Sequence, residues 1–282
     1  MTDLSEALDG VRGLVLDADG VIVLKGELLP GAPEALARLV ALGIPFRIVT
    51  NFSAAHRDTL SARFADGAVP GARFITAASA AAAYTATHYP GGRLFVISAP
   101  DALREFDGQT LVSLDEADAA APGELAAVVI GDGGDELSYR NLNVAFRAIR
   151  RGAEFVAMHR NPWWLTPRGE TLDAGAFVAG LEEATGRAPV VCGKPSPVVF
   201  TQALAGLAED LGVRRLPARD VAMVGDDPVA DIAAARRVGL RGILVLTGKV
   251  GAGEAGAAMS GPARTRPTAI AQSLPDIVAA LD

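Results

Sequence analysis

Cysteine, long apolar runs and excess positive charge are what this sequence lacks. Cys192 is the only cysteine, which excludes an intramolecular disulfide and is typical of a reducing compartment. No apolar run approaches the roughly 18 residues that span a bilayer, and the acidic N-terminus is unlike a signal peptide. The net charge of −7 argues against nonspecific binding to nucleic acid or an anionic membrane. We therefore expect a cytoplasmic protein that has neither nucleic acid nor membrane as a partner.

The composition is typical of a globular protein. Half of the 282 residues are hydrophobic and 21% are charged, and this length allows one or two domains. Short apolar runs that read as buried strands alternate with helical patterns, which predicts an α/β fold with a parallel sheet. After residue 76 a new series of strands and helices begins, and it ends near Pro189. We therefore predict a core made of residues 1–76 and 190–282, with a second α/β domain, residues 77–189, inserted into it.

The first strand leads directly into two carboxylates. The mostly apolar stretch from Val11 to Leu16 is followed by Asp17, Asp19 and Gly20. Ligands of open α/β sheets bind at the carboxyl ends of the strands, and residues two apart on an extended chain point the same way. Asp17 and Asp19 would repel each other unless they shared a cation or one took a proton. The pair is suited to a nucleophile and a proton donor, although an acidic turn after a strand is also common.

Three further predicted strands end in polar residues. The strand over residues 45–49 leads into Thr50 and Asn51, just before a helix expected over 54–64. These groups could cradle a phosphate, while Ser53 could simply cap the helix. The strand over 190–192 leads into Lys194, which lies between Gly193 and Pro195. The strand over 220–224 leads into Gly225, Asp226 and Asp227, and Asp231 follows four residues later. Lys194 could be an anion clamp or a solvated turn residue.

The four strand ends together predict a catalytic site. The carboxyl ends of parallel strands converge on one edge of a sheet. Carboxylates from two strands are the hard oxygen ligands that Mg²⁺ prefers, and lysine, threonine and asparagine donors suit a phosphoryl group. One carboxylate then remains as a nucleophile and another as an acid and base.

These motifs resemble those of the haloacid dehalogenase superfamily of aspartyl-phosphate phosphatases. Residues 16–21 (Leu-Asp-Ala-Asp-Gly-Val) match its first motif, and Thr50 with Asn51 the second. Lys194 matches the third motif, and residues 225–232 match the fourth. The resemblance covers nearly the whole chain. It implies a Rossmann-like three-layer core with a parallel sheet, plus an inserted class II α/β cap between the second and third motifs.

Finer details are similar to subclass IIA of that superfamily. Residues 193–197 (Gly-Lys-Pro-Ser-Pro) and 242–249 (Gly-Ile-Leu-Val-Leu-Thr-Gly-Lys) resemble the group of the 4-nitrophenylphosphatase-like, pyridoxal phosphate and phosphoglycolate phosphatases. Residues 8–13 and 172–175 are similar to the phospholysine phosphohistidine inorganic pyrophosphate phosphatase group. Some relatives in that group carry serine where this chain has Asp19. This departure favours Asp19 as an ordinary acid and base carboxylate. It also weakens any inference that this protein shares the substrate of those relatives.

The resemblance also implies roles for the acidic residues. Asp17 attacks phosphorus and becomes aspartyl-phosphate, while Asp19 protonates the leaving oxygen and then activates water. Mg²⁺ is held by the Asp17 side chain, the Asp19 backbone carbonyl and Asp226, with support from Asp227 or Asp231. Thus a Mg²⁺ cofactor is expected.

Basic and polar residues complete the implied site. By the same resemblance, Thr50 and Asn51 bind phosphoryl oxygens, and Lys194 neutralises charge on Asp17 and on the phosphate. Physics agrees, because Mg²⁺ and lysine offset the repulsion between a carboxylate nucleophile and an anionic substrate.

A loop in the inserted domain is the candidate for substrate choice. The segment from His159 to Trp164 follows a predicted strand, and a second loop is expected around Pro167 and Gly169. His159, Arg160 and Trp163 offer charge, hydrogen bonds and a flat apolar surface for substrate binding. The tryptophans could equally pack the inserted domain or a dimer interface. The sequence therefore leaves undecided whether the protein forms a homodimer through the inserted domain.

The sequence leaves the substrate open. The first hypothesis is a Mg²⁺-dependent phosphatase of a small phosphorylated metabolite. A phosphatase of phosphorylated side chains or of pyrophosphate is an alternative, although a large inserted domain limits access to the site. A non-catalytic binding protein on the same fold is a further alternative, against which the intact Asp17, Asp19, Lys194 and Asp226 argue.

Overall fold

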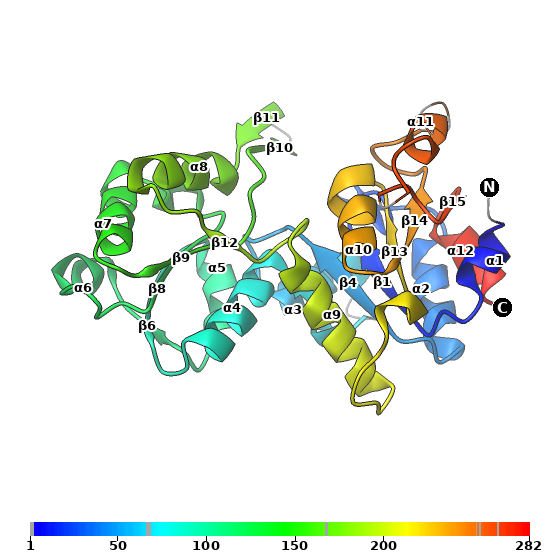
Figure 1. The fold of residues 1–282 in the computed structure, drawn as a ribbon, viewed down its shortest axis with the longest axis horizontal. Helices are drawn as coiled ribbons and strands as arrows, with labels where there is room; N and C mark the ends of the chain where they lie inside the picture. Colours follow the sequence, from blue (N-terminus) through cyan, green and yellow to red (C-terminus); the bar gives the residue numbers. More distant parts are fainter. Residues whose placement is uncertain (1–2, 66–68, 167–168, 252, 254, 264) are drawn as a thin grey trace. The chain divides into compact units, whose positions relative to one another are not determined.

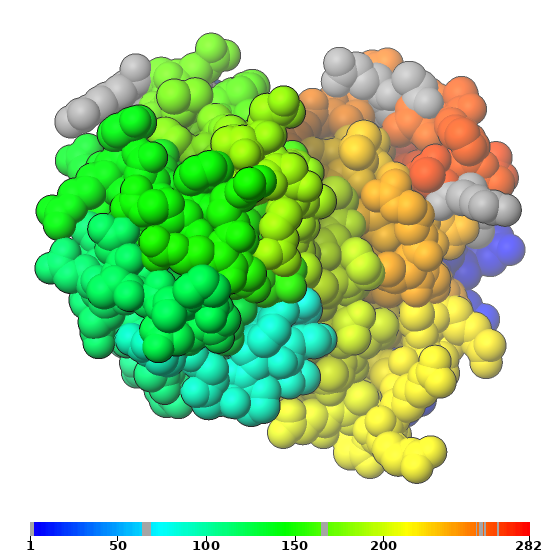
Figure 2. Space-filling view, turned by 60° about the vertical axis from the view of Figure 1, so that its left-hand side comes forward, coloured from blue at the N-terminus to red at the C-terminus, as the bar shows by residue number. Residues whose placement is uncertain are grey.

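The chain forms two compact units (Figures 1 and 2). A computed structural model describes residues 3–65, 69–166, 169–251, 253, 255–263 and 265–282. The first unit contains the chain up to Thr50, residues 58–75 and residues 194–282, and the second contains residues 51–57 and 76–193. The chain therefore passes between the units at four points. The sequence-based division had placed residues 51–57, Thr76 and residues 190–193 in the core, whereas in the structure they group with the second unit.

The first unit is built on a six-stranded sheet. Its strand order is β15-β14-β13-β1-β4-β5, and the pairings among β15, β14, β13, β1 and β4 are parallel. All five positions of β1, of β4 and of β13 are buried, as the apolar runs of the sequence predict. The strands are β1 (Gly13–Asp17), β4 (Phe46–Thr50), β5 (Phe74–Thr76), β13 (Val221–Gly225), β14 (Arg241–Val245) and β15 (Ala269–Ala271).

Helices pack on this sheet in two groups (Figure 1). Helix α12 contacts both α1 and α2, and α9 contacts α10 and β4. A right-handed crossover from β1 to β4 and another from β13 to β14 run in opposite directions along the sheet, which places their helices on opposite faces. The helices are α1 (Leu4–Leu8), α2 (Ala32–Ala41), α3 (Arg57–Ala65), α9 (Pro197–Asp210), α10 (Ala234–Arg237), α11 (Ala255–Met259) and α12 (Leu274–Ala280). A short hairpin, β2 (Val23–Leu24) and β3 (Glu27–Leu28), follows β1.

The second unit has its own parallel sheet and core. Its five strands follow the order β12-β9-β8-β6-β7. A buried cluster that includes Phe95, Val128, Ile149 and Phe155 fills the space between this sheet and its helices. The strands are β6 (Arg93–Ile97), β7 (Thr110–Leu111), β8 (Ala127–Ile130), β9 (Glu154–Ala157) and β12 (Val190–Val191). The helices are α4 (Ala77–His88), α5 (Pro100–Leu103), α6 (Leu114–Ala119), α7 (Tyr139–Arg150) and α8 (Ala174–Thr185). The predicted α/β fold with a parallel core sheet is thus confirmed.

Two local predictions were wrong. The helix expected from Ala54 begins only at Arg57, and Ser53 does not cap it, because its hydroxyl oxygen instead accepts a hydrogen bond from the Asp132 N–H. The loop expected beyond Trp163 is an antiparallel hairpin of β10 (Trp163–Thr166) and β11 (Gly169–Leu172). Trp163 and Trp164 therefore lie on a strand, while residues 167 and 168 lie outside the described residues. Of the helices in the described part of the chain, none combines the length and the apolar character that crossing a bilayer requires.

Candidate active site

The predicted polar residues of the first unit lie at the carboxyl edge of its sheet. Leu16 of β1 is paired with Val224 of β13, and Asp17 is paired with Val49 of β4. Because the strands are parallel and in this register, their carboxyl ends are level. Asp17, Thr50 and Asp226 are thereby brought to one edge.

Lys194 joins two carboxylates at this edge. Its Nζ lies 2.6 Å from Asp17 Oδ1 and 2.8 Å from Asp231 Oδ1. All three side chains are buried, so water screens these charges poorly. Lys194 is therefore a buried partner of two carboxylates, which excludes the alternative of a solvated turn residue.

Glycines make room for Asp226. A Cβ atom on Gly20 or on Gly248 would collide with the Asp226 carboxylate, and the backbone of Gly20 is left-handed, with φ 75°. The Lys249 N–H donates a hydrogen bond of 2.7 Å to Asp226 Oδ2. The position of Asp226 is thus set by backbone atoms and by two residues that lack side chains.

Asp227 and Asp231 have different surroundings. Asp227 Oδ1 accepts hydrogen bonds from the N–H groups of Val229 and Ala230 at the start of a π-helix, Pro228–Ala233, and its Oδ2 lies 2.7 Å from Lys249 Nζ. Asp231 projects from that helix into the cluster, and its Oδ2 accepts from the Asp227 N–H at 3.1 Å. Asp231 is therefore the acidic residue of this pair that lies beside Asp17.

The electrostatics of the cluster favour a cation. Burial raises the pKa of Asp17 well above its ordinary value, and repulsion from Asp231 adds to this. Burial also raises the pKa of Asp226. For Lys194, burial alone would lower the pKa, but Asp17 and Asp231 raise it above its ordinary value. Three carboxylates against one ammonium leave two negative charges, which a divalent cation would balance.

The donor set fits such a cation. One oxygen of each of Asp17, Asp226 and Asp231 lies within 4.8 Å of the others. Opposite ligands of an octahedral Mg²⁺ are about 4.2 Å apart, so modest side-chain movements would bring these oxygens into one coordination sphere. The predicted metal residues Asp17 and Asp226 are among the three. The Asp19 side chain is exposed, although crowding by neighbouring protein atoms desolvates it enough to raise its pKa.

The predicted substrate-binding residues are divided between the two units. Thr50 is buried at the end of β4 in the first unit, whereas Asn51 belongs to the second. There the Asn51 Nδ2 donates a hydrogen bond of 3.3 Å to Asn161 Oδ1. Arg160 is paired with Glu182 of α8 at 2.5 Å, and Trp163 is exposed on β10.

His159 is a buried residue of the second unit. Its exposure is 1%, and its Nε2 lies 2.9 Å from the Ser53 hydroxyl and 3.6 Å from Asp173 Oδ1. Burial lowers the pKa of His159 to about 4. Sequence reasoning missed Ser53 as its partner, because the two are 106 positions apart.

The chain matches families and structures of known proteins. Residues 14–111 match the family model described as haloacid dehalogenase-like hydrolase, and residues 191–277 match the HAD-hydrolase-like model. The chain is 32% identical over 255 residues to the phospholysine phosphohistidine inorganic pyrophosphate phosphatase of Bos taurus, with 88% of each chain covered. The chain belongs to the haloacid dehalogenase-like hydrolases. The predicted family and the predicted enzyme class of hydrolase are thus confirmed.

Solved structures extend this likeness. The p-nitrophenyl phosphatase from Archaeoglobus fulgidus has a TM-score of 0.82 and 28% identity, with 96% of this chain and 99% of that chain covered. A glycerol phosphate phosphatase from Mycobacterium tuberculosis in complex with magnesium has a TM-score of 0.79 and 27% identity, with 98% and 79% covered. The likeness therefore extends over both units.

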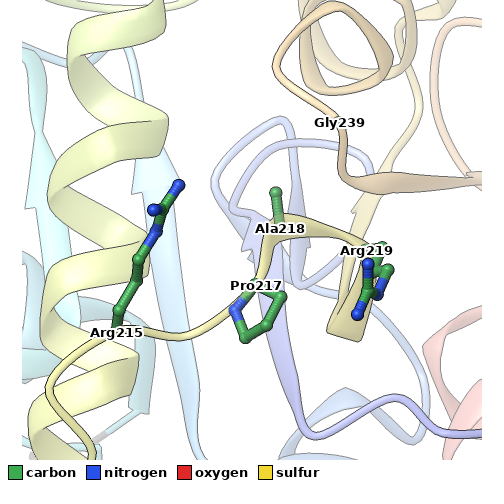
Figure 3. A pocket seen from close by; sticks show the side chains of 5 residues that line it. All are labelled: Arg215, Pro217, Ala218, Arg219 and Gly239. Carbon is green, nitrogen blue, oxygen red and sulfur yellow. The ribbon is translucent and has the colours of Figure 1, made fainter.

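This hydrolase also has a cavity away from the acidic cluster (Figure 3). Its volume is about 440 Å³, and its lining is Arg215, Pro217, Ala218, Arg219 and Gly239. These residues precede β13 and β14, so the cavity lies at the amino edge of the sheet. The acidic cluster follows the carboxyl ends of the strands, and the two features are therefore separate.

Sequence reasoning missed three further contacts of the cluster. The Lys249 side chain and N–H hold Asp227 and Asp226 respectively, and the Thr247 hydroxyl donates to the Gly20 carbonyl oxygen. The signal was present, since residues 247–249 (Thr-Gly-Lys) also follow a buried strand of the same parallel sheet. In this haloacid dehalogenase-like hydrolase, a fifth strand end thus supports the site.

Proposed function

We propose that this protein is a Mg²⁺-dependent phosphatase that hydrolyses a small phosphate monoester through an aspartyl-phosphate. The observation that carries the proposal is the buried contact of Lys194 with Asp17 and Asp231, with Asp226 close by. A candidate nucleophilic carboxylate, a lysine ammonium group and three carboxylates suited to a metal ion therefore lie close together. The named relatives support the reaction class, because they include a p-nitrophenyl phosphatase and a glycerol phosphate phosphatase.

The metal would be held by acidic groups of the first unit. Asp17 and Asp226 supply side-chain oxygens, the Asp19 backbone supplies a carbonyl, and Asp231 supports the set. When bound, Mg²⁺ supplies positive charge that draws phosphate oxygens towards the anionic nucleophile. The magnesium complex of the related glycerol phosphate phosphatase supports this choice of ion.

Two carboxylates carry out the chemical steps. An oxygen of Asp17 attacks phosphorus, and the bond between phosphorus and the ester oxygen breaks. Asp19 gives its proton to that leaving oxygen, so that an alcohol departs. Asp19 then takes a proton from water, whose oxygen attacks the aspartyl-phosphate, and inorganic phosphate leaves as the Asp17 carboxylate is restored. The raised pKa of Asp19 favours its role as the acid.

Charge and hydrogen-bond donors stabilise the phosphoryl group. Lys194 offsets the negative charge of Asp17 and of the phosphate, and Thr50 and Asn51 donate to phosphoryl oxygens. In this proposal the first unit is the catalytic core and the second unit is the cap. The hairpin that carries Trp163, together with Arg160, would contact the organic part of the substrate. A small phosphorylated metabolite is the expected substrate, and a homodimer through the cap is a further proposal.

The decisive experiment is hydrolysis of p-nitrophenyl phosphate by the purified protein. We expect turnover with Mg²⁺ and its loss in excess chelator, followed by recovery when Mg²⁺ is restored. Asp17→Asn should lower turnover at least about 10³-fold because the amide is a poor nucleophile, while Asp276→Asn on the exposed surface of α12 is the matched control. Full activity in chelator, or in Asp17→Asn, would refute the proposed mechanism.

A further inference from the structure

The turn after β9 connects segments that are far apart in the sequence. Ser53 contacts His159 at 2.9 Å, and Asn51 donates to Asn161 at 3.3 Å. The Gly193 N–H donates to the Met158 carbonyl oxygen at 2.7 Å. All of these residues belong to the second unit. The turn therefore holds both the residues that follow Thr50 and the residue that precedes Lys194.

Hydrogen bonds fix the state of His159 within this turn. The Asn161 N–H donates to His159 Nδ1 at 3.2 Å, so Nδ1 is the acceptor nitrogen and Nε2 carries the proton. That proton points to the Ser53 hydroxyl oxygen, which also accepts from the Asp132 N–H at 3.0 Å. The Ser98 hydroxyl donates to the Ser53 carbonyl oxygen at 3.0 Å. Ser53 is therefore held from three sides.

Close packing leaves this turn little freedom. A Cβ atom on Gly193 would lie 2.6 Å from Asn51 Oδ1 and 2.8 Å from the Met158 carbonyl oxygen. A Cβ atom on Gly175 would collide with the backbone of Arg160 and Asn161, and the Gly175 N–H donates to the Asn161 carbonyl oxygen. Asn51 is thus confined by a backbone that α8 holds in place.

We propose that His159 is a positioning residue for phosphate binding and does not itself contact substrate. Through Ser53 and Asn161 it holds Asn51 in one place, and Asn51 meets the phosphoryl group that every substrate shares. This inference rests on the proposed function and replaces the earlier expectation that His159 selects the organic part of the substrate. Its burial at 1% exposure, with both ring nitrogens engaged, supports this role.

The test compares His159→Phe with His159→Gln. Phenylalanine fills a similar volume without hydrogen bonds, whereas the glutamine amide can donate from near the position of Nε2. We expect His159→Phe to raise the KM for p-nitrophenyl phosphate and for glycerol phosphate by the same factor, up to about tenfold. The dissociation constant of inorganic phosphate, measured by calorimetry with Mg²⁺, should rise equally. The kcat should change less, and His159→Gln should recover most of the loss.

Other variants keep the inference open to refutation. Gly193→Ala should weaken phosphate binding in the same way, while Gly180→Ala, which faces open space on α8, should not. Should His159→Phe fail to fold, Ser53→Ala is the milder change and should show the same pattern. Unequal changes for the two esters with unchanged phosphate binding would overturn the inference, as would no change at all. A wild-type protein that binds phosphate but hydrolyses neither ester would refute the proposed function, while the calorimetry would still test His159.

Discussion

At the scale of single residues, the site depends on the absence of side chains at two glycines as much as on its charged residues. Gly20 and Gly248 leave space that the Asp226 carboxylate fills. The carboxylates of Asp17, Asp226 and Asp231 lie close together because one lysine reaches two of them. Small changes beside this cluster should therefore alter metal binding before they alter the fold.

Gly248→Ala tests this dependence. The new Cβ atom would displace Asp226 Oδ2, so we expect the Mg²⁺ concentration for half-maximal activity to rise about tenfold or more. Gly251→Ala is the matched control, because a Cβ atom there meets nothing within 4 Å. Activity titrations with Mg²⁺ give the comparison. Equal activation constants for Gly248→Ala and the wild type would show that Asp226 does not hold the metal.

His159 and Asp173 should have opposite effects on stability in acid. The pKa of buried His159 is about 4, against 6.5 in the unfolded chain. Neutral His159 therefore makes its full contribution to the free energy of unfolding above pH 6.5. As the pH falls from 6.5 to 4 the unfolded chain takes up a proton first, which removes up to about 3 kcal/mol. Burial raises the pKa of Asp173 to about 6. Its buried charge costs stability above pH 6, and this cost is relieved as the pH falls towards 3.8.

Urea unfolding between pH 7 and 4 measures both effects. Relative to the wild type, His159→Gln should gain stability on acidification and Asp173→Asn should lose it. Both tryptophans of the chain, Trp163 and Trp164, lie in the second unit, so their fluorescence reports on the unit that contains this pair. Parallel pH profiles for the wild type and both variants would contradict the assigned pKa directions.

At the scale of elements, the segment of residues 51–57 is held by buried polar contacts. Arg57 donates from its N–H and its Nε to the carboxylate of Glu105, a side chain with 0% exposure. The His56 N–H donates to Asp101. These contacts explain why the segment groups with the second unit, although it directly follows a strand of the first.

Glu105→Gln should loosen this segment. The amide cannot accept on both sides, so we expect the second unit to lose roughly 1–3 kcal/mol of stability, and the amides of residues 51–57 to exchange hydrogen faster. Arg140→Ala is the control, because its pair with Asp115 is exposed and worth under about 1 kcal/mol. Denaturant unfolding and hydrogen exchange measure the two effects. Unchanged exchange in residues 51–57 would mean that another contact anchors them.

The elements that sequence reasoning found are those with local signals. Asp17 and Asp226 were found because each comes at the carboxyl end of a buried strand, and the carboxyl ends of parallel strands converge. Asp231 was found from its spacing after Asp226. The expectation that Lys194 follows a strand of the same sheet was wrong, because β12 pairs with β9 in the second unit, although Lys194 itself does reach Asp17. The late start of α3 was missed because Ala54 and Ala55 have good helix propensity, and contacts with residues far away in the sequence, such as Asp101, hold the preceding residues outside the helix. The hairpin of β10 and β11 was missed because its residues are largely exposed and show no buried alternation. Contacts such as Asn51 with Asn161 span 110 positions, and no local pattern reveals them.

At the scale of the whole molecule, the acidic cluster lies entirely in the first unit. A ligand that binds only the folded state stabilises it, by about 2.7 kcal/mol at a hundredfold excess over its dissociation constant. Mg²⁺ should therefore stabilise the first unit directly.

Thermal unfolding followed by two signals tests this expectation. Circular dichroism reports on both units, whereas tryptophan fluorescence reports only on the second. We expect Mg²⁺ to raise the transition seen by circular dichroism more than the transition seen by fluorescence, and Asp226→Asn to abolish the difference. Equal shifts for both signals would show that the two units unfold as one.

The four points at which the chain passes between the units have a consequence for protein engineering. Residues 50 and 51 are neighbours in the sequence but belong to different units, as do residues 193 and 194. Consider a chimaera in which only residues 77–189 are replaced by the matching segment of a relative. Ser53 and Arg57 would then come from this chain, whereas the residues at their partner positions, 159 and 105, would come from the relative. A transplant that also carries residues 51–57 and 190–193 would keep these partners together. The smallest exchangeable part of this enzyme is therefore discontinuous in sequence.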